Sequence, residues 1–210
     1  LRTARSGPRP WRWLLPAGTV ARVRLNGQDV PFTVTPAVAC IALQLDTPAL
    51  TSSSFAITLT PWQGTLTHPA SIAEGDTLHC TVSGAHIRGV DDRCGMLAAW
   101  AQTSATSMSA TVRADVLAPY RGYGRLGQIN FSRRTFFADC ATDDGARFWL
   151  PVDVAGLPRY ELAQQGGISI GTGAVQCVLL LRNNTSAPLC TTGVLRVART
   201  IADLTGAHAI

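Results

Sequence analysis

Histidine, cysteine and carboxylate side chains are the groups of this chain that could support catalysis. The four histidines are His68, His79, His86 and His208. His79 and Cys80 are adjacent, so on a strand they point to opposite faces and cannot form a nucleophile–base pair. No G-x-S-x-G sequence marks a nucleophile elbow. We therefore expect no catalytic residues, while a triad assembled from distant positions stays open.

The sequence motifs that would indicate a metal site or a nucleotide site are weak as well. The six cysteines contain no C-x-x-C pair, and His86 with Asp91 and Asp92 makes a poor metal site. Gly122–Gly127 matches G-x-G-x-x-G, but the residues after it lack the helical period that a dinucleotide site needs. We expect no metal and no cofactor, and the cysteines in apolar stretches favour buried thiols over disulfides.

All 18 Lys-plus-Arg residues are arginines, which excludes a Walker P-loop and a lysine Schiff base. Six of the arginines lie in residues 1–28, which contain no acidic residue. Arginine neutralises phosphates and tryptophan stacks on bases, so this leader is a candidate RNA-binding segment. Its candidate RNA-binding residues are Arg2, Arg5, Arg9, Arg12, Trp11 and Trp13. The alternative is a solvated terminus whose tryptophans pack on the body.

The composition indicates a globular body that positions these groups. Of the 210 residues, 46% are hydrophobic and only 15% are charged, which excludes disorder over most of the chain. No apolar run approaches the roughly 18 residues that a membrane span needs. The low charged fraction favours burial, either in a core or against partners.

From about residue 19 the chain reads as successive β-strands bounded by Gly, Pro, Asn, Asp and Ser. The predicted strands are 19–25, 30–35, 38–45, 55–60, 77–83, 95–102, 109–117, 128–138, 147–154, 174–182 and 190–198. Asn26-Gly27 and Asp144-Gly145 are typical of tight turns. Short helices are the alternatives over 91–102 and 158–165. These elements predict an all-β sandwich, jelly roll or barrel.

Two stretches carry features of a known family. One runs from Gly75-Asp76-Thr77-Leu78-His79 through a strand at 80–83 to Ile87-Arg88, Asp91-Asp92 and a strand from Gly95. The other is Phe148-Trp149-Leu150-Pro151-Val152-Asp153-Val154-Ala155-Gly156, followed by Val175–Leu181, Asn183-Asn184 and Gly193–Val197. Across about residues 38–206 the chain resembles the small coat protein of comoviruses.

The resemblance implies a single eight-stranded antiparallel jelly-roll β-sandwich with an extended basic N-terminal segment. Residues 1–37 would form an arm and lead-in strands, and residues 38–210 the coat domain. The chain would be a non-enzymatic capsid subunit, cut from a polyprotein, near the five-fold axis of a small icosahedral positive-strand RNA virus of plants. Its location would be the virion. Its partners would be copies of itself, a larger coat protein and the viral genomic RNA, without a membrane.

Two other functions stay open beside a coat subunit. The first is a secreted or cell-surface β-sandwich module that recognises glycans or proteins. Asparagines at 130, 183 and 184 begin N-x-S/T sequons that would matter in a secreted protein. The second is an all-β hydrolase or oxidoreductase.

Overall fold

The computed structural model describes residues 9–47, 53–114, 133–171 and 174–188. These residues form sixteen β-strands in five sheets, without a helix. The all-β prediction is therefore confirmed. In the described part of the chain, no helix is long and apolar enough to cross a membrane.

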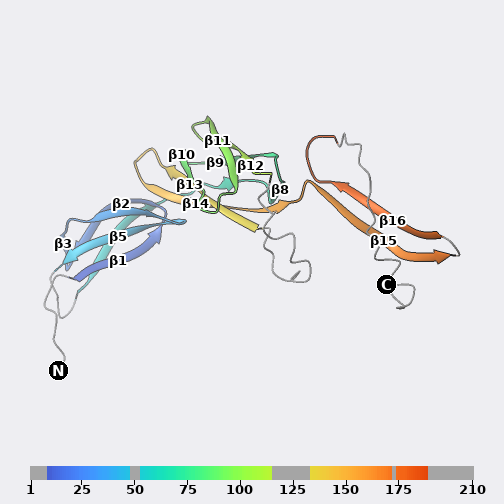
Figure 1. The fold of residues 1–210 in the computed structure, drawn as a ribbon. Helices are drawn as coiled ribbons and strands as arrows, with labels where there is room; N and C mark the ends of the chain where they lie inside the picture. Colours follow the sequence, from blue (N-terminus) through green and yellow to red (C-terminus); the bar gives the residue numbers. More distant parts are fainter. Residues whose placement is uncertain (1–8, 48–52, 115–132, 172–173, 189–210) are drawn as a thin grey trace, which may run out of the picture.

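Two three-stranded sheets form an N-terminal unit, drawn mainly in blue in Figure 1. One sheet contains β1 (Arg9–Pro16), β5 (Cys40–Thr47) and β4 (Thr33–Ala37), and the other contains β3 (Gln28–Asp29), β2 (Gly18–Leu25) and β6 (Phe55–Pro61). Val23, Leu43 and Leu45 form a buried cluster within it. Asn26 and Gly27 have φ of 51° and 84°, as the predicted tight turn between β2 and β3 requires.

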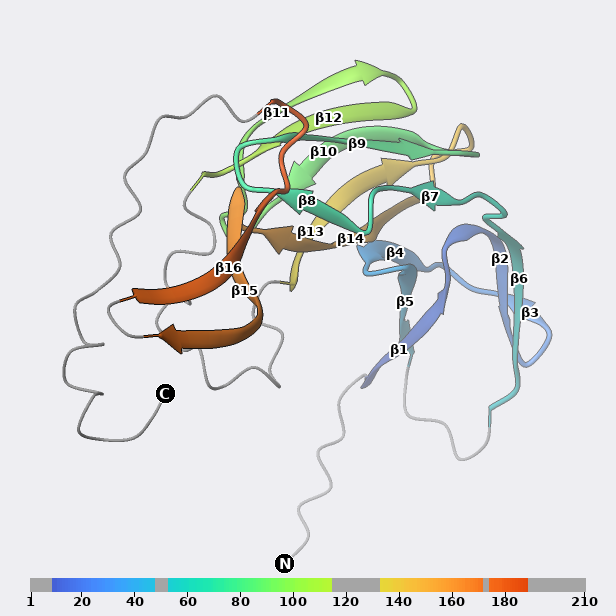
Figure 2. The ribbon, with the colours of Figure 1, turned by 90° about the vertical axis from the view of Figure 1, so that its right-hand side faces the viewer.

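Two four-stranded sheets form a β-sandwich next to this unit (Figures 1 and 2). One has the order β10 (His86–Asp91), β13 (Arg133–Ala141), β14 (Arg147–Leu157), β8 (Ser71–Ala73). The other has the order β11 (Leu97–Ser104), β12 (Ser107–Val112), β9 (Thr77–Val82), β7 (Leu66–Thr67). Alternate residues of β9, β12 and β14 are buried, because successive side chains of a strand face opposite sides. Phe136 and Phe148 are the largest side chains of the shared core.

The last described strands form a separate hairpin. β15 (Tyr160–Gly171) and β16 (Ala174–Asn183) pair antiparallel with each other, and the hairpin extends away from the sandwich (Figures 1 and 2). Hydrogen bonds fix its base to the body. The Asn184 amide donates to the Pro158 carbonyl at 2.9 Å, and the Ser186 backbone N–H donates to Asp76 at 2.8 Å.

Several sequence predictions need correction. The helix alternatives are wrong, because residues 97–104 and 160–171 are strands β11 and β15. Residues 161–165 have good helix formers, but pairing with β16 satisfies their backbone instead. β14 pairs parallel with β8, which departs from a wholly antiparallel sandwich. The eight-stranded jelly roll stays a prediction. The predicted strand 190–198 and the glycine motif at 122–127 lie outside the described residues.

The N-terminal leader contributes a strand to the fold. β1 pairs with β5 over its whole length, from Arg9 opposite Thr47 to Pro16 opposite Cys40. Backbone pairing thus crosses the expected boundary between residues 37 and 38, and that division into domains stays a prediction.

Candidate ligand-binding groove

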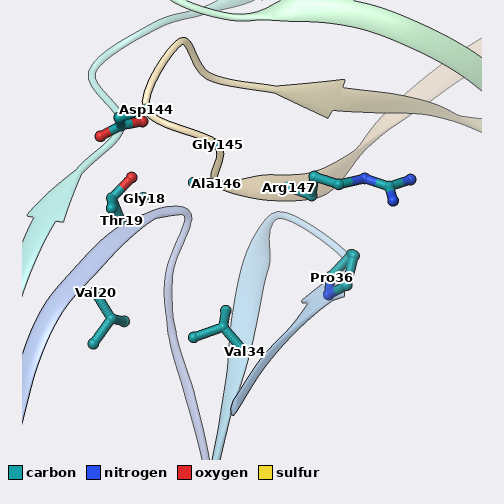
Figure 3. Close-up of a pocket in the computed structure, with 9 residues that line it drawn as sticks. All are labelled: Gly18, Thr19, Val20, Val34, Pro36, Asp144, Gly145, Ala146 and Arg147. Carbon is teal, nitrogen blue, oxygen red and sulfur yellow. The ribbon is translucent and has the colours of Figure 1, made fainter. Parts of the chain in front are cut away.

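Two adjoining cavities open where the N-terminal unit meets the sandwich. Their volumes are about 300 Å³ and about 470 Å³, and both are lined by Gly18, Thr19 and Asp144. Figure 3 shows the smaller cavity, with β2 and β4 on one side and the turn between β13 and β14 on the other. We call the two cavities together the groove.

The turn Thr142–Ala146 forms one wall of the groove. The Ala146 backbone N–H donates to the Thr142 hydroxyl oxygen at 3.0 Å, and the Thr142 N–H donates to the Ala146 carbonyl at 2.9 Å. Gly145 supplies the positive φ of 89° that the turn needs. This hydrogen bonding directs Asp143 and Asp144 outward, and both side chains are exposed.

Two glycines allow the backbone segments of the groove to approach each other. A Cβ at Gly64 would lie 1.8 Å from the Ser83 carbonyl oxygen, and one at Gly18 would lie 2.2 Å from the Thr60 carbonyl oxygen. Neither position has room for a side chain, so larger residues there would force the segments apart. The shape of the groove therefore depends on both glycines.

The indole ring of Trp62 is the aromatic surface of the groove. Its Nε1–H donates to the Ser83 carbonyl at 3.1 Å, and its ring centroid lies 5.0 Å from that of Phe148 in the core. Trp62 is half-buried and lines the larger cavity. The hydrogen bond and the ring contact hold the indole in one orientation, which preorganises this wall for a ligand.

The charged groups of the groove are mainly acidic. The Thr142 hydroxyl donates a hydrogen bond to Asp144 and lowers the pKa of this carboxyl, which is therefore ionised at neutral pH. Figure 3 shows the Thr19 hydroxyl directed toward Asp144. Arg147 points away from Asp144 in Figure 3, and its guanidinium donates to Asp139 at 2.7 Å.

The chemistry available in the groove is hydrogen bonding. Exposed Thr60 and Gln63 add a hydroxyl and an amide to the two carboxylates. Among the described residues, no three His, Cys, Asp or Glu side chains gather as metal ligands. A site of this composition can accept and donate hydrogen bonds to a polar ligand and pack one of its faces on Trp62.

The predicted RNA-binding residues lie elsewhere. Arg2 and Arg5 are outside the described residues, and the other four are on β1. Trp11 and Trp13 stack with centroids 5.9 Å apart, and both contact Phe55.

Trp13 packs against the core of the N-terminal unit, whereas Arg12 is exposed. This packing matches the alternative in which the tryptophans cover the body. The role of the six residues in RNA binding stays a prediction, and none of the four on β1 lines the groove.

No protein-family model matches the chain, and no curated protein matches it. One similar solved structure is the SGBP-B protein of the Bacteroides ovatus mixed-linkage glucan utilization locus, in complex with a mixed-linkage heptasaccharide. The likeness covers 80% of this chain and 47% of that chain, so our chain spans about half of it, at 11% identity and a TM-score of 0.27. Neither a shared fold nor a shared ligand follows from a TM-score this low.

Proposed function

We propose that the chain is a recognition module whose groove binds a short segment of glycan without transforming it. The observation that supports this function is the lining of the groove. The groove is lined by the carboxylates of Asp143 and Asp144 and by the polar side chains of Thr60 and Gln63, beside the indole of Trp62. Gly18 and Gly64, where no side chain fits, complete the lining. Carboxylate, hydroxyl and amide groups match sugar hydroxyls, and an indole packs on the apolar face of a sugar ring.

The charges of the groove disfavour other ligand classes. Asp143 and Asp144 repel phosphates, and the nearest arginine, Arg147, is engaged by Asp139. An apolar ligand would desolvate both carboxylates and add no hydrogen bond to those from Thr142 and His86, which is costly. A neutral, polyhydroxylated ligand avoids both penalties. The two volumes also lie at the lower end of the range of about 300–1,000 Å³ that small-ligand sites occupy.

Calorimetry with a glycan selected on an oligosaccharide array tests this function. Asp144→Asn removes the charge but keeps the size of the side chain. A hydrogen bond to a charged group contributes about 1.5–3 kcal/mol, so binding should weaken roughly ten- to a hundredfold. Gln63→Ala should weaken it by a smaller factor, since its amide is uncharged.

Asp29→Asn is the matched control. Asp29 is exposed on β3, where it accepts a hydrogen bond from Arg24 at 2.9 Å, and it does not line the groove. The Asp29→Asn variant should bind the glycan with the same affinity as the unmodified chain. Absence of any bound glycan, or equal losses in the Asp144 and Asp29 variants, would overturn the proposal.

The coat-subunit role is the second candidate, and one observation favours it. Leu180 and Leu181 are neighbours on β16 and point to opposite faces of the hairpin, yet they are 45% and 50% exposed. Exposed aliphatic side chains on both faces suit a chain that assembles with others. In this role the chain would be a jelly-roll subunit of a virion, with copies of itself, a larger coat protein and RNA as partners.

Electron microscopy of the chain with such a partner tests the second candidate. Particles should form, and removal of residues 1–8, which precede β1, should lower their RNA content. Dispersed monomers in every mixture would contradict the coat-subunit role. Unchanged RNA content in the truncated particles would contradict the role of Arg2 and Arg5.

A further inference from the structure

The β15–β16 hairpin has no partner strand in the described part of the chain. Its sheet contains two strands, and neither outer edge forms a backbone hydrogen bond with another described strand. Val178 is 60% exposed, in addition to the half-exposed leucines that follow it. A two-stranded hairpin is marginally stable in water, so one that presents aliphatic side chains on both faces needs further contacts.

A second edge strand, β11, belongs to the sandwich. β11 is the edge strand of its sheet, and residues 98–104 are all exposed. Trp100 is 42% exposed on this strand. β11 has no charged residue and no proline, which are the features that usually protect an edge strand from pairing with another chain.

The two edges match in charge and in length. Residues 174–181 of β16 have no charged residue and no proline, like β11, so pairing would desolvate no charged side chain. The seven exposed residues of β11 can pair with seven residues of β16 over roughly 23 Å at about 3.3 Å per residue. β15 is less suited than β16 to pairing with another strand, because its pairing with β16 is interrupted between Gln165 and Ser169.

We propose that the outer edge of β16 pairs with β11 of a second copy of this chain. Figures 1 and 2 both show the hairpin extending away from β11, so the two edges of one molecule do not meet. The pairing adds a strand to the β11 sheet and brings the exposed Trp100 to the strand that carries Val178 and Leu180. Because the two surfaces differ, the contact is head-to-tail and generates a ring or a filament.

Sedimentation velocity of three variants tests this pairing. Leu180→Lys places a charge on the hairpin, and Trp100→Lys places one on the β11 edge. Both side chains are exposed, so both variants should fold, which circular dichroism checks. Leu14→Lys is the matched control, because Leu14 is 68% exposed on β1, outside the proposed contact.

The unmodified chain and the Leu14 variant should form oligomers that grow with concentration. The Leu180 and Trp100 variants should each be monomers. An equimolar mixture of the two should form a dimer and nothing larger, because only one hairpin and one β11 edge remain intact. A misfolded variant could not restore this dimer.

Three results would overturn the pairing: a monomeric unmodified chain at all concentrations, variants that assemble like the control, or a mixture that stays monomeric. The proposal is independent of glycan binding. The Leu180 variant should bind glycan like the unmodified chain. The two experiments therefore show separately whether the glycan-binding proposal or the pairing proposal fails.

Discussion

The Nε2 atom of His86 lies 2.6 Å from Oδ1 of Asp143. His86 begins β10, and Asp143 belongs to the turn that forms one wall of the groove. The contact therefore links β10 to the turn between β13 and β14, which forms one wall of the groove. Both side chains are solvent-exposed, at 47% and 92%, which limits the strength of the interaction.

Removal of the histidine should have a small effect on binding. An exposed pair contributes about 0.2–1 kcal/mol, so His86→Ala should weaken glycan binding by less than about fivefold in calorimetry. Arg93→Ala, which breaks the exposed contact with Asp91, should have no effect. A loss beyond tenfold in the His86 variant would show that the histidine itself contacts the ligand.

The pKa of Asp144 should respond to its hydroxyl donor. In Thr142→Val the donor is gone, so the lowered pKa should return toward the ordinary value of 3.8. Because the folded-state pKa is depressed, this carboxyl contributes stability above about pH 3.8, and the contribution is lost as the pH falls through the folded-state pKa. NMR titration of the carboxyl carbon measures both values. Equal pKa values in the variant and in the exposed-site control Thr58→Val would contradict the assignment.

Two buried thiols should destabilise the fold in alkali. Burial raises the pKa of Cys80 and of Cys140 from 9.0 to about 12. Between these values the unfolded chain loses the thiol protons and the folded chain keeps them. The free energy of unfolding should therefore fall above pH 9, by up to about 1.4 kcal/mol per pH unit for each thiol.

Urea unfolding at several alkaline pH values measures this slope. Cys80→Ala should make the slope smaller by the contribution of one thiol. Partial burial and the neighbouring Asp92 raise the pKa of Cys94 as well, but this thiol is exposed, so Cys94→Ala is the control and should reduce the slope less. A slope that is the same in the Cys80 variant and the unmodified chain would contradict the account.

Neighbouring phenylalanines on β13 should differ in their contribution to stability. Phe136 is 0% exposed in the core, so Phe136→Ala should lower the free energy of unfolding by about 3–5 kcal/mol. Phe137 is on the opposite face and only partly buried, so Phe137→Ala should cost clearly less. Chemical denaturation measures both. Equal losses would contradict the assignment of faces on β13.

Much of the strand pattern could be predicted from the sequence. The predictions at 19–25, 77–83 and 147–154 overlap β2, β9 and β14 closely, because alternation and bounding turns are local signals. β1 was missed because Arg9 and Arg12 indicate a solvated leader. Pairing with β5, and the packing of Trp13 into the N-terminal unit, stabilise the strand instead.

The groove could not be predicted in the same way. The dipeptide Asp144-Gly145 predicts the turn that the structure contains, but nothing local shows that Gly18, Gly64 and Ser83 lie beside it. Close backbone approach at a glycine is a property of the folded chain. The candidate residues on β1 are recognised as arginines and tryptophans that lie close together in the sequence. The residues of the groove are far apart in the sequence and come together only in the folded chain.

NMR mapping of backbone amide shifts during titration with the array-selected oligosaccharide tests the central claim most directly. The account predicts shifts concentrated at Thr19, Gln63, Asp143 and Asp144, and weaker shifts in the Asp144→Asn variant. Shifts concentrated on another face, or an unchanged spectrum with every oligosaccharide, would contradict it.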